Sequence, residues 1–315
     1  MFKGQAVTFP SCGVIKGLLE TQLSVFPAHQ SYLHRRFQDA GDVELAFVEK
    51  LATLILKITD GRAASYAADY RWLAETVLEE ECEFRRTGRY RHSSFDEVEK
   101  IVYADRAFMT RYMNGLLLSQ LWWRNHTEVM RFFCDVFLPG KVQQFTHLEI
   151  GPGHGLFLYF AAAAPGCTAV TGWDVSPASI DLVRNVHRLL GLTRPVALEL
   201  INMFDAPQQH FDSITFSEVL EHLEEPSLAL RTIFNLVKPG GRAFINAPVN
   251  SPAPDHISLF RTPEDVVALV RDAGFEIEQT LFSPTTGATL ARARKLSLTI
   301  SAAVIGRKPA NAHDH

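Results

Sequence analysis

The pattern of apolar residues differs between the two halves of the chain. Between residues 14 and 138 apolar residues recur every three to four positions, most clearly in 43–59 and 98–123. This spacing indicates amphipathic helices. Ser94 is followed three residues later by Glu97, which is the spacing of a helix N-terminal capping box. We therefore expect the first half to be entirely helical.

After residue 144, short apolar runs of strand type alternate with helical patterns. The strand-like runs are 145–150, 168–174, 195–202, 213–216, 242–248, 275–282 and 295–306. Such alternation predicts an α/β fold with a Rossmann-like sheet of parallel strands and helices on both faces. The last two runs have no full helix between them, so we expect them to pair antiparallel at the edge of the sheet. Two domains are predicted, a helical one at 1–140 and an α/β one at 141–315.

Composition and charge exclude several classes of function. The chain has 315 residues, a net charge of −4, 47% hydrophobic and 21% charged residues, which is typical of a globular enzyme. The negative charge gives no reason to expect a nucleic acid or an anionic membrane as partner. Four scattered cysteines without a CxxC pair do not suggest a disulfide framework or a thiolate zinc site. With no apolar run of membrane-spanning length, we expect a cytoplasmic protein.

A glycine loop follows the first strand-like run of the second half. Its sequence, EIGPGHG, places Gly151, Gly153 and Gly155 at the start of a helical pattern, where an α/β sheet binds its ligand. The dinucleotide pattern GxGxxG would need glycine where the chain has Leu156, which disfavours an oxidoreductase. Glu149, two residues before the first glycine, would repel a pyrophosphate but suits the cationic sulfonium and ammonium groups of S-adenosylmethionine.

With these motifs in this order, residues 144–307 resemble a class I S-adenosylmethionine-dependent methyltransferase. The resemblance implies a seven-stranded sheet with six parallel strands and one antiparallel strand, covered by the helical half as a lid. In the family, the acidic residue that ends the second strand grips the ribose hydroxyls, and the end of the third strand flanks the adenine. The residues that the resemblance assigns to S-adenosylmethionine are Glu149, Gly151, Pro152, Gly153, Gly155, Asp174, Val175, Asn202, Met203, Phe204 and Ser217.

Three ionisable residues follow the fourth strand, in the sequence SEVLEH. On a helix Glu218, Glu221 and His222 would share one face, near the transferred methyl group. One interpretation makes His222 a general base that Glu218 steadies. A second, less favoured, adds His256 and makes all four residues ligands of a divalent metal. It rests on a similarity to small-RNA 2′-O-methyltransferases and quinone-biosynthesis O-methyltransferases. In a third, the residues are only structural.

The acceptor is expected to be a small organic molecule, aromatic or natural-product-like, methylated at oxygen, carbon or nitrogen. Tyr112, Trp122 and His256 are the candidate substrate contacts, because aromatic walls suit a flat, mostly apolar molecule. A metal-dependent enzyme acting on vicinal hydroxyls or a ribose is the alternative within enzymes. A cofactor-binding interaction protein without activity is the alternative outside them, and the sequence leaves a homodimer open.

Overall fold

The first half of the chain is helical, as its spacing predicts. The computed structural model describes residue 10 and residues 13–103, 105–138, 144–205 and 207–310. The α-helices of this half are α1 (Val14–Val25), α2 (Gln30–Phe37), α3 (Asp42–Thr59), α4 (Ala63–Thr87), α5 (Phe95–Val98), α6 (Arg106–Trp122) and α7 (Arg124–Phe132). Three further segments are the 3₁₀ turn η1 (Pro27–His29) and the π-helical segments η2 (Glu99–Tyr103) and η3 (Phe133–Phe137). The side chain of Ser94 accepts a hydrogen bond from the Glu97 N–H at the start of α5, so the predicted N-cap is present.

The second half forms one seven-stranded sheet. Its strands are β1 (Phe145–Ile150), β2 (Cys167–Asp174), β3 (Val196–Leu200), β4 (Phe211–Ser217), β5 (Val237–Val249), β6 (Glu276–Pro284) and β7 (Ile300–Arg307). They lie in the order β3-β2-β1-β4-β5-β7-β6, and only β7 runs antiparallel to its two neighbours. The strand order reverses between β1 and β4, and the carboxyl ends of these two strands therefore form the switch point where such sheets bind ligands. The predicted fold class is confirmed.

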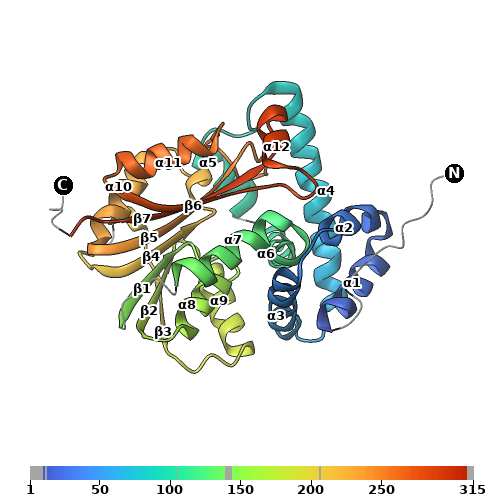
Figure 1. The fold of residues 1–315 in the computed structure, drawn as a ribbon, viewed down its shortest axis with the longest axis horizontal. Helices are drawn as coiled ribbons and strands as arrows, with labels where there is room; N and C mark the ends of the chain where they lie inside the picture. Colours follow the sequence, from blue (N-terminus) through green and yellow to red (C-terminus); the bar gives the residue numbers. More distant parts are fainter. Residues whose placement is uncertain (1–9, 11–12, 104, 139–143, 206, 311–315) are drawn as a thin grey trace.

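Helices cover both faces of the sheet (Figure 1). They are α8 (Leu156–Ala163), α9 (Pro177–Leu189), α10 (Pro226–Leu236), α11 (Pro263–Asp272) and α12 (Leu290–Leu296), with the turns η4 (Met203–Asp205) and η5 (Leu220–His222). Helices α10 and α11 belong to one apolar cluster with the strands, whereas α8 and α9 belong to clusters on the other face. The short helix α12 was not expected between the last two strands. It forms because the Thr289 side chain caps the Arg292 N–H, and it delays the start of β7 to Ile300.

The helical half and the sheet share one apolar core. Phe133 and Phe137 in η3 pack on Phe244 of β5, with ring centroids 5.2 and 5.5 Å apart. Phe133 also meets Phe157 of α8 at 4.9 Å. Because these rings join the two halves, the helices have a fixed place against the sheet. The predicted domain boundary at 140 lies outside the described residues, and the division into two domains stays a prediction.

Among the described helices, none is both long enough and apolar enough to cross a membrane.

Candidate active site

The glycine loop connects β1 to α8 at the switch point of the sheet. Gly151 has a φ of 67°, a left-handed conformation that favours glycine. A Cβ on Gly151 would lie 2.9 Å from Cγ2 of Val219, so a side chain there would collide with the segment that follows β4. Nε2 of His187, on α9, donates a hydrogen bond of 3.1 Å to the Gly155 carbonyl oxygen. This bond holds the other end of the loop. The loop is therefore fixed between α9 and the residues after β4.

Two carboxylates flank this loop at the ends of neighbouring strands. Glu149 is the penultimate residue of β1 and is 2% exposed; among the described residues its Oε2 atom has no hydrogen-bond partner. Burial raises its pKa well above the ordinary value. Asp174 ends β2 and accepts a hydrogen bond of 2.8 Å from the Ser176 N–H, and burial raises its pKa as well. Glu149 is thus a buried acid without a compensating cation among the residues that the structure describes.

The segment after β4 does not form the α-helix that its spacing suggested. Glu218 has a φ of 56°, and only the short 3₁₀ turn η5 follows it. The Glu218 N–H donates to the Asn246 carbonyl at 2.8 Å, and the Asn246 side-chain amide donates to Glu218 Oε1 at 2.6 Å. These two bonds to β5 hold Glu218 in its left-handed conformation. An α-helix cannot include such a residue, so none starts at Glu218. Glu218 therefore faces Asn246 rather than sharing a helix face with its neighbours.

Glu221, His222 and His256 nevertheless converge, and each offers a ligand atom within 4.8 Å of the others. Nε2 of His222 lies 3.7 Å and Nε2 of His256 lies 3.9 Å from Oε1 of Glu221. The two imidazole rings meet edge to face at 5.0 Å. Below, "the acid–histidine cluster" means Glu221, His222 and His256. Glu218, the fourth residue of the predicted set, is not part of it.

Glu221 and His256 of the cluster are buried and His222 is half-buried, and the Glu221 carboxylate accepts no hydrogen bond from the described residues. Glu221 is 0% exposed, and neither of its side-chain oxygens has a hydrogen-bond partner among the residues that the structure describes. Burial, reinforced by the nearby Glu218, raises the pKa of Glu221 well above its usual range. Burial also lowers the pKa of His256 to about 4. An acid and two imidazoles without a compensating charge form the kind of site that takes up a proton or a cation.

Sequence comparison identifies the family to which this site belongs. Residues 122–280, about half of the chain, match a family described as the methyltransferase domain. The chain is a class I S-adenosylmethionine-dependent methyltransferase. The match contains the glycine loop, Asp174, and all three residues of the acid–histidine cluster.

Curated relatives of this methyltransferase carry one recurring name. A ubiquinone biosynthesis O-methyltransferase of Coxiella burnetii (strain Dugway 5J108-111) is 33% identical over 136 residues, which are 41% of this chain and 57% of that protein. The protein of the same name from Neisseria meningitidis serogroup C (strain 053442) is 26% identical over 156 residues, 42% of this chain and 64% of that protein. The chain thus spans less than two thirds of the length of these relatives.

A solved structure supports the fold. An O-methyltransferase family protein from Burkholderia thailandensis superposes with a TM-score of 0.55 at 16% identity, covering 78% of this chain and 72% of that one.

The predicted cofactor residues of the methyltransferase end or directly follow β1, β2, β3 and β4, at the carboxyl ends of these strands. The cofactor of the family is S-adenosylmethionine, and Glu149, with its unpartnered oxygen, fits a cationic group at this place. Val175 and Phe204 are 59% and 43% exposed, which is unusual for large apolar side chains, whereas Met203 is buried. The exposed side chains of Val175 and Phe204 fit the flat adenine base of the cofactor, whose ribose would lie at Asp174. The roles of the individual residues stay predictions.

The predicted substrate contacts lie in different environments. Trp122 is fully buried, and its indole N–H donates to Gln22 Oε1 at 3.1 Å, inside the core of the helical half. This placement leaves it no surface to offer an acceptor. The Tyr112 hydroxyl donates to Oδ1 of Asp255 at 2.8 Å, and both residues are buried. Asp255 was missed by the sequence reasoning, although it directly precedes His256.

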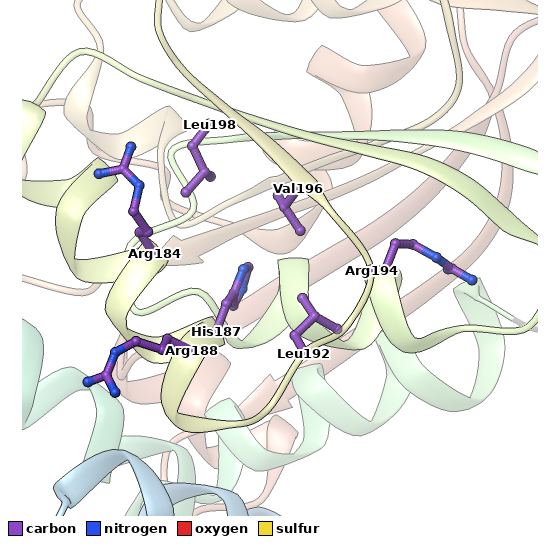
Figure 2. Close-up of a pocket in the computed structure, with 7 residues that line it drawn as sticks. All are labelled: Arg184, His187, Arg188, Leu192, Arg194, Val196 and Leu198. Atoms are coloured by element: carbon purple, nitrogen blue, oxygen red, sulfur yellow. The ribbon is translucent and has the colours of Figure 1, made fainter.

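A separate cavity of about 400 Å³ lies between α9 and β3 (Figure 2). None of the residues predicted to bind cofactor or substrate lines it. Arg184 and Arg188 point to one side of it and Arg194 to the other, so the three guanidinium groups do not converge on a common point. The cavity therefore does not form an anion site, and the acid–histidine cluster remains the candidate active site.

Proposed function

We propose that this chain transfers a methyl group from S-adenosylmethionine to a hydroxyl oxygen of a small organic acceptor, aromatic or natural-product-like. Family membership supports the donor, and the names of the curated relatives support an oxygen as the methylated atom. The observation that carries the proposal is the acid–histidine cluster, which adjoins the glycine loop through the contact between Gly151 and Val219. A hydroxyl must lose its proton to become a good nucleophile, and this cluster can remove it.

His222 is the residue that we assign as base. Its Nδ1 lies 2.9 Å from the Asp255 carbonyl oxygen. A carbonyl can only accept, so Nδ1 carries the hydrogen and Nε2 keeps a free lone pair. Nε2 takes the acceptor's hydroxyl proton while the new C–O bond forms and the C–S bond breaks. S-adenosylmethionine supplies the methyl group on a sulfonium, whose carbon is already activated. The remaining work of the protein is alignment and exclusion of water.

A metal-assisted version of the same reaction has its own support. His256 Nδ1 lies 2.6 Å from the Ser251 carbonyl oxygen, so His256 also carries its hydrogen on Nδ1. Both Nε2 lone pairs therefore face the unpartnered Glu221 carboxylate, an arrangement that suits a divalent cation. Glu221, His222 and His256 would hold the ion, which would supply a Lewis acid that lowers the pKa of the acceptor's hydroxyl.

A methyl-transfer assay separates the two versions. With labelled S-adenosylmethionine and 3,4-dihydroxybenzoate as acceptor, we expect His222→Ala to reduce the rate by about 100- to 10,000-fold, the usual value of a general base. His92→Ala, a histidine of the helical half beside Glu97, is the matched control and keeps wild-type activity. Full activity of the His222→Ala variant would contradict both versions.

Metal dependence is tested on the same protein without relying on the rate alone. If an ion is bound, EDTA abolishes transfer, Mg²⁺ or Mn²⁺ restores it, and Mn²⁺ titration followed by calorimetry shows one site that Glu221→Gln and His256→Ala remove. If His222 acts alone as base, EDTA has no effect and the His256→Ala variant keeps most of its activity. Binding of S-adenosylmethionine without labelled product from any of the metabolites in a cell extract would instead favour an interaction protein.

A further inference from the structure

The two imidazoles of the cluster owe their orientation to one loop, residues 250–256, which follows β5. The Ser251 carbonyl accepts from His256 Nδ1 at 2.6 Å, and the Asp255 carbonyl accepts from His222 Nδ1 at 2.9 Å. Each carbonyl fixes the tautomer and the ring direction of one histidine, and both Nε2 atoms are left to face Glu221. The shape of this loop therefore decides where the reactive nitrogen atoms point.

The loop begins with a strained residue and is not held by β5 alone. Asn250 has a φ of 47°, which is uncommon for a residue other than glycine. Its N–H donates to the Phe260 carbonyl at 3.0 Å, and its side-chain amide donates to the Arg261 carbonyl at 2.9 Å. Backbone strain of this kind persists only where surrounding contacts hold it.

Two tyrosines of the helical half supply such contacts, one at each end of the loop. The Tyr112 hydroxyl, on α6, donates to Asp255 Oδ1 at 2.8 Å. The Tyr90 hydroxyl, in the segment after α4, accepts from the Ser251 N–H at 3.0 Å, and the Tyr90 ring packs edge to face on the His256 ring at 5.8 Å. Tyr112 and Tyr90 are 4% and 7% exposed. Each tyrosine thus holds the residue whose carbonyl orients one histidine.

We propose that Tyr90 and Tyr112 are positioning residues through which the helical half sets the tautomer and direction of His256 and His222. The helical half is then part of the active-site structure and not only a cover over the acceptor. Tyr112 acts through Asp255, and Tyr90 acts through Ser251. The kinetic part of this inference rests on the proposed function, whereas the arrangement of the imidazoles does not.

Nitrogen-15 NMR of histidine-labelled protein at constant pH tests the arrangement directly, because imidazole nitrogen shifts report which nitrogen carries the hydrogen. The resonances are assigned with His222→Gln and His256→Gln variants. In the wild-type protein we expect both histidines to carry the hydrogen on Nδ1. Tyr112→Phe should lose this signature at His222 and keep it at His256, and Tyr90→Phe should do the opposite.

The variants that lose the NMR signature should also lose activity. Loss of a group that orients a ligand or base costs about 10- to 100-fold in activity. We expect kcat to fall by this factor in each variant while the KM for S-adenosylmethionine stays unchanged. Tyr66→Phe, a buried tyrosine of α4 whose ring lies beside the Arg62 guanidinium, should leave both readouts at wild-type values.

Two further variants keep the test decisive if a tyrosine variant does not fold. Asp255→Asn retains an oxygen that can accept from Tyr112 and should preserve the His222 signature, whereas Asp255→Ala should lose it. Wild-type spectra in Tyr90→Phe, Tyr112→Phe and Asp255→Ala would overturn the inference. Absence of methyl transfer in the wild-type protein would overturn the proposed function and leave the spectroscopic result to decide this inference alone.

Discussion

Replacing Glu149 by glutamine should make the free chain more stable and the cofactor complex weaker. Glu149 is 2% exposed, and its Oε2 has no partner among the described residues. Burial is the cause of its raised pKa, so in the free chain the ionised form is disfavoured. Glutamine has nearly the same shape and carries no charge. The substitution therefore removes the cost of the buried charge together with the attraction for a cationic ligand.

The sign of the pH dependence follows from the direction of that pKa. The folded chain holds a proton on Glu149 more tightly than the unfolded chain, whose glutamate titrates near the ordinary value of 4.5. Its contribution to stability is complete below that pH and is lost as the pH rises through the raised pKa. At pH 8 we expect Glu149→Gln to raise the free energy of unfolding by about 1–3 kcal/mol, because the cost of ionising the buried acid, about 1.4 kcal/mol for each pH unit between its ordinary and its raised pKa, disappears with the charge.

The effect on the ligand has the opposite sign. A hydrogen bond to a charged group contributes about 1.5–3 kcal/mol, which corresponds to about 10- to 100-fold in Kd. Urea unfolding between pH 5 and 8 and calorimetry with S-adenosylhomocysteine measure the two effects. Glu199→Gln is the matched control, because this glutamate on β3 accepts from the Trp173 indole N–H at 3.0 Å and should leave the Kd unchanged. If Glu149→Gln bound the ligand normally and was less stable at pH 8, Glu149 would be a structural residue and the reasoning would be refuted.

Three other predictions follow from packing and placement. Gly151→Ala should lower the free energy of unfolding by about 1–2 kcal/mol because position 151 has a left-handed backbone. Adding Val219→Ala should remove only the clash between the new Cβ and Val219, so urea unfolding of the double variant should still show the backbone cost. Asp174→Ala should weaken binding of S-adenosylhomocysteine by about 10-fold or more in calorimetry, since a hydrogen bond to a charged group is lost. Trp122→Phe should destabilise the chain by about 1–3 kcal/mol through the lost bond to Gln22, and should leave the KM for the acceptor unchanged; a raised KM would place Trp122 at the substrate.

The sheet could be predicted from the sequence because its signals are local. Short apolar strand runs, the helical runs between them and the glycine loop each identify one element, and their order specifies the topology. The reversed strand β7 could be predicted because the sequence shows no full helical pattern before it, and the structure has only the short α12 there. The position of Glu149 and Asp174 at strand ends followed in the same way.

The details of the site could not be predicted, because they depend on contacts between distant segments. Spacing placed Glu218 on a helix with Glu221, whereas two hydrogen bonds from β5 hold it in a left-handed turn. Periodicity shows that Tyr112 and Trp122 are apolar-face residues but not what each one touches. Only the folded chain shows Tyr112 bonded to Asp255, 143 residues away. The convergence of His256 on Glu221 was expected from the resemblance, not from spacing.

The central claim is that the acid–histidine cluster removes a proton from a hydroxyl while S-adenosylmethionine donates a methyl group. Mass spectrometry of the product formed from methyl-¹³C-labelled S-adenosylmethionine and 3,4-dihydroxybenzoate tests it most directly. The wild-type chain should place one labelled methyl group on an acceptor oxygen, and His222→Ala should bind S-adenosylhomocysteine normally while forming almost none of this product. An equal yield from the His222→Ala variant, or a label found on carbon, would contradict the account.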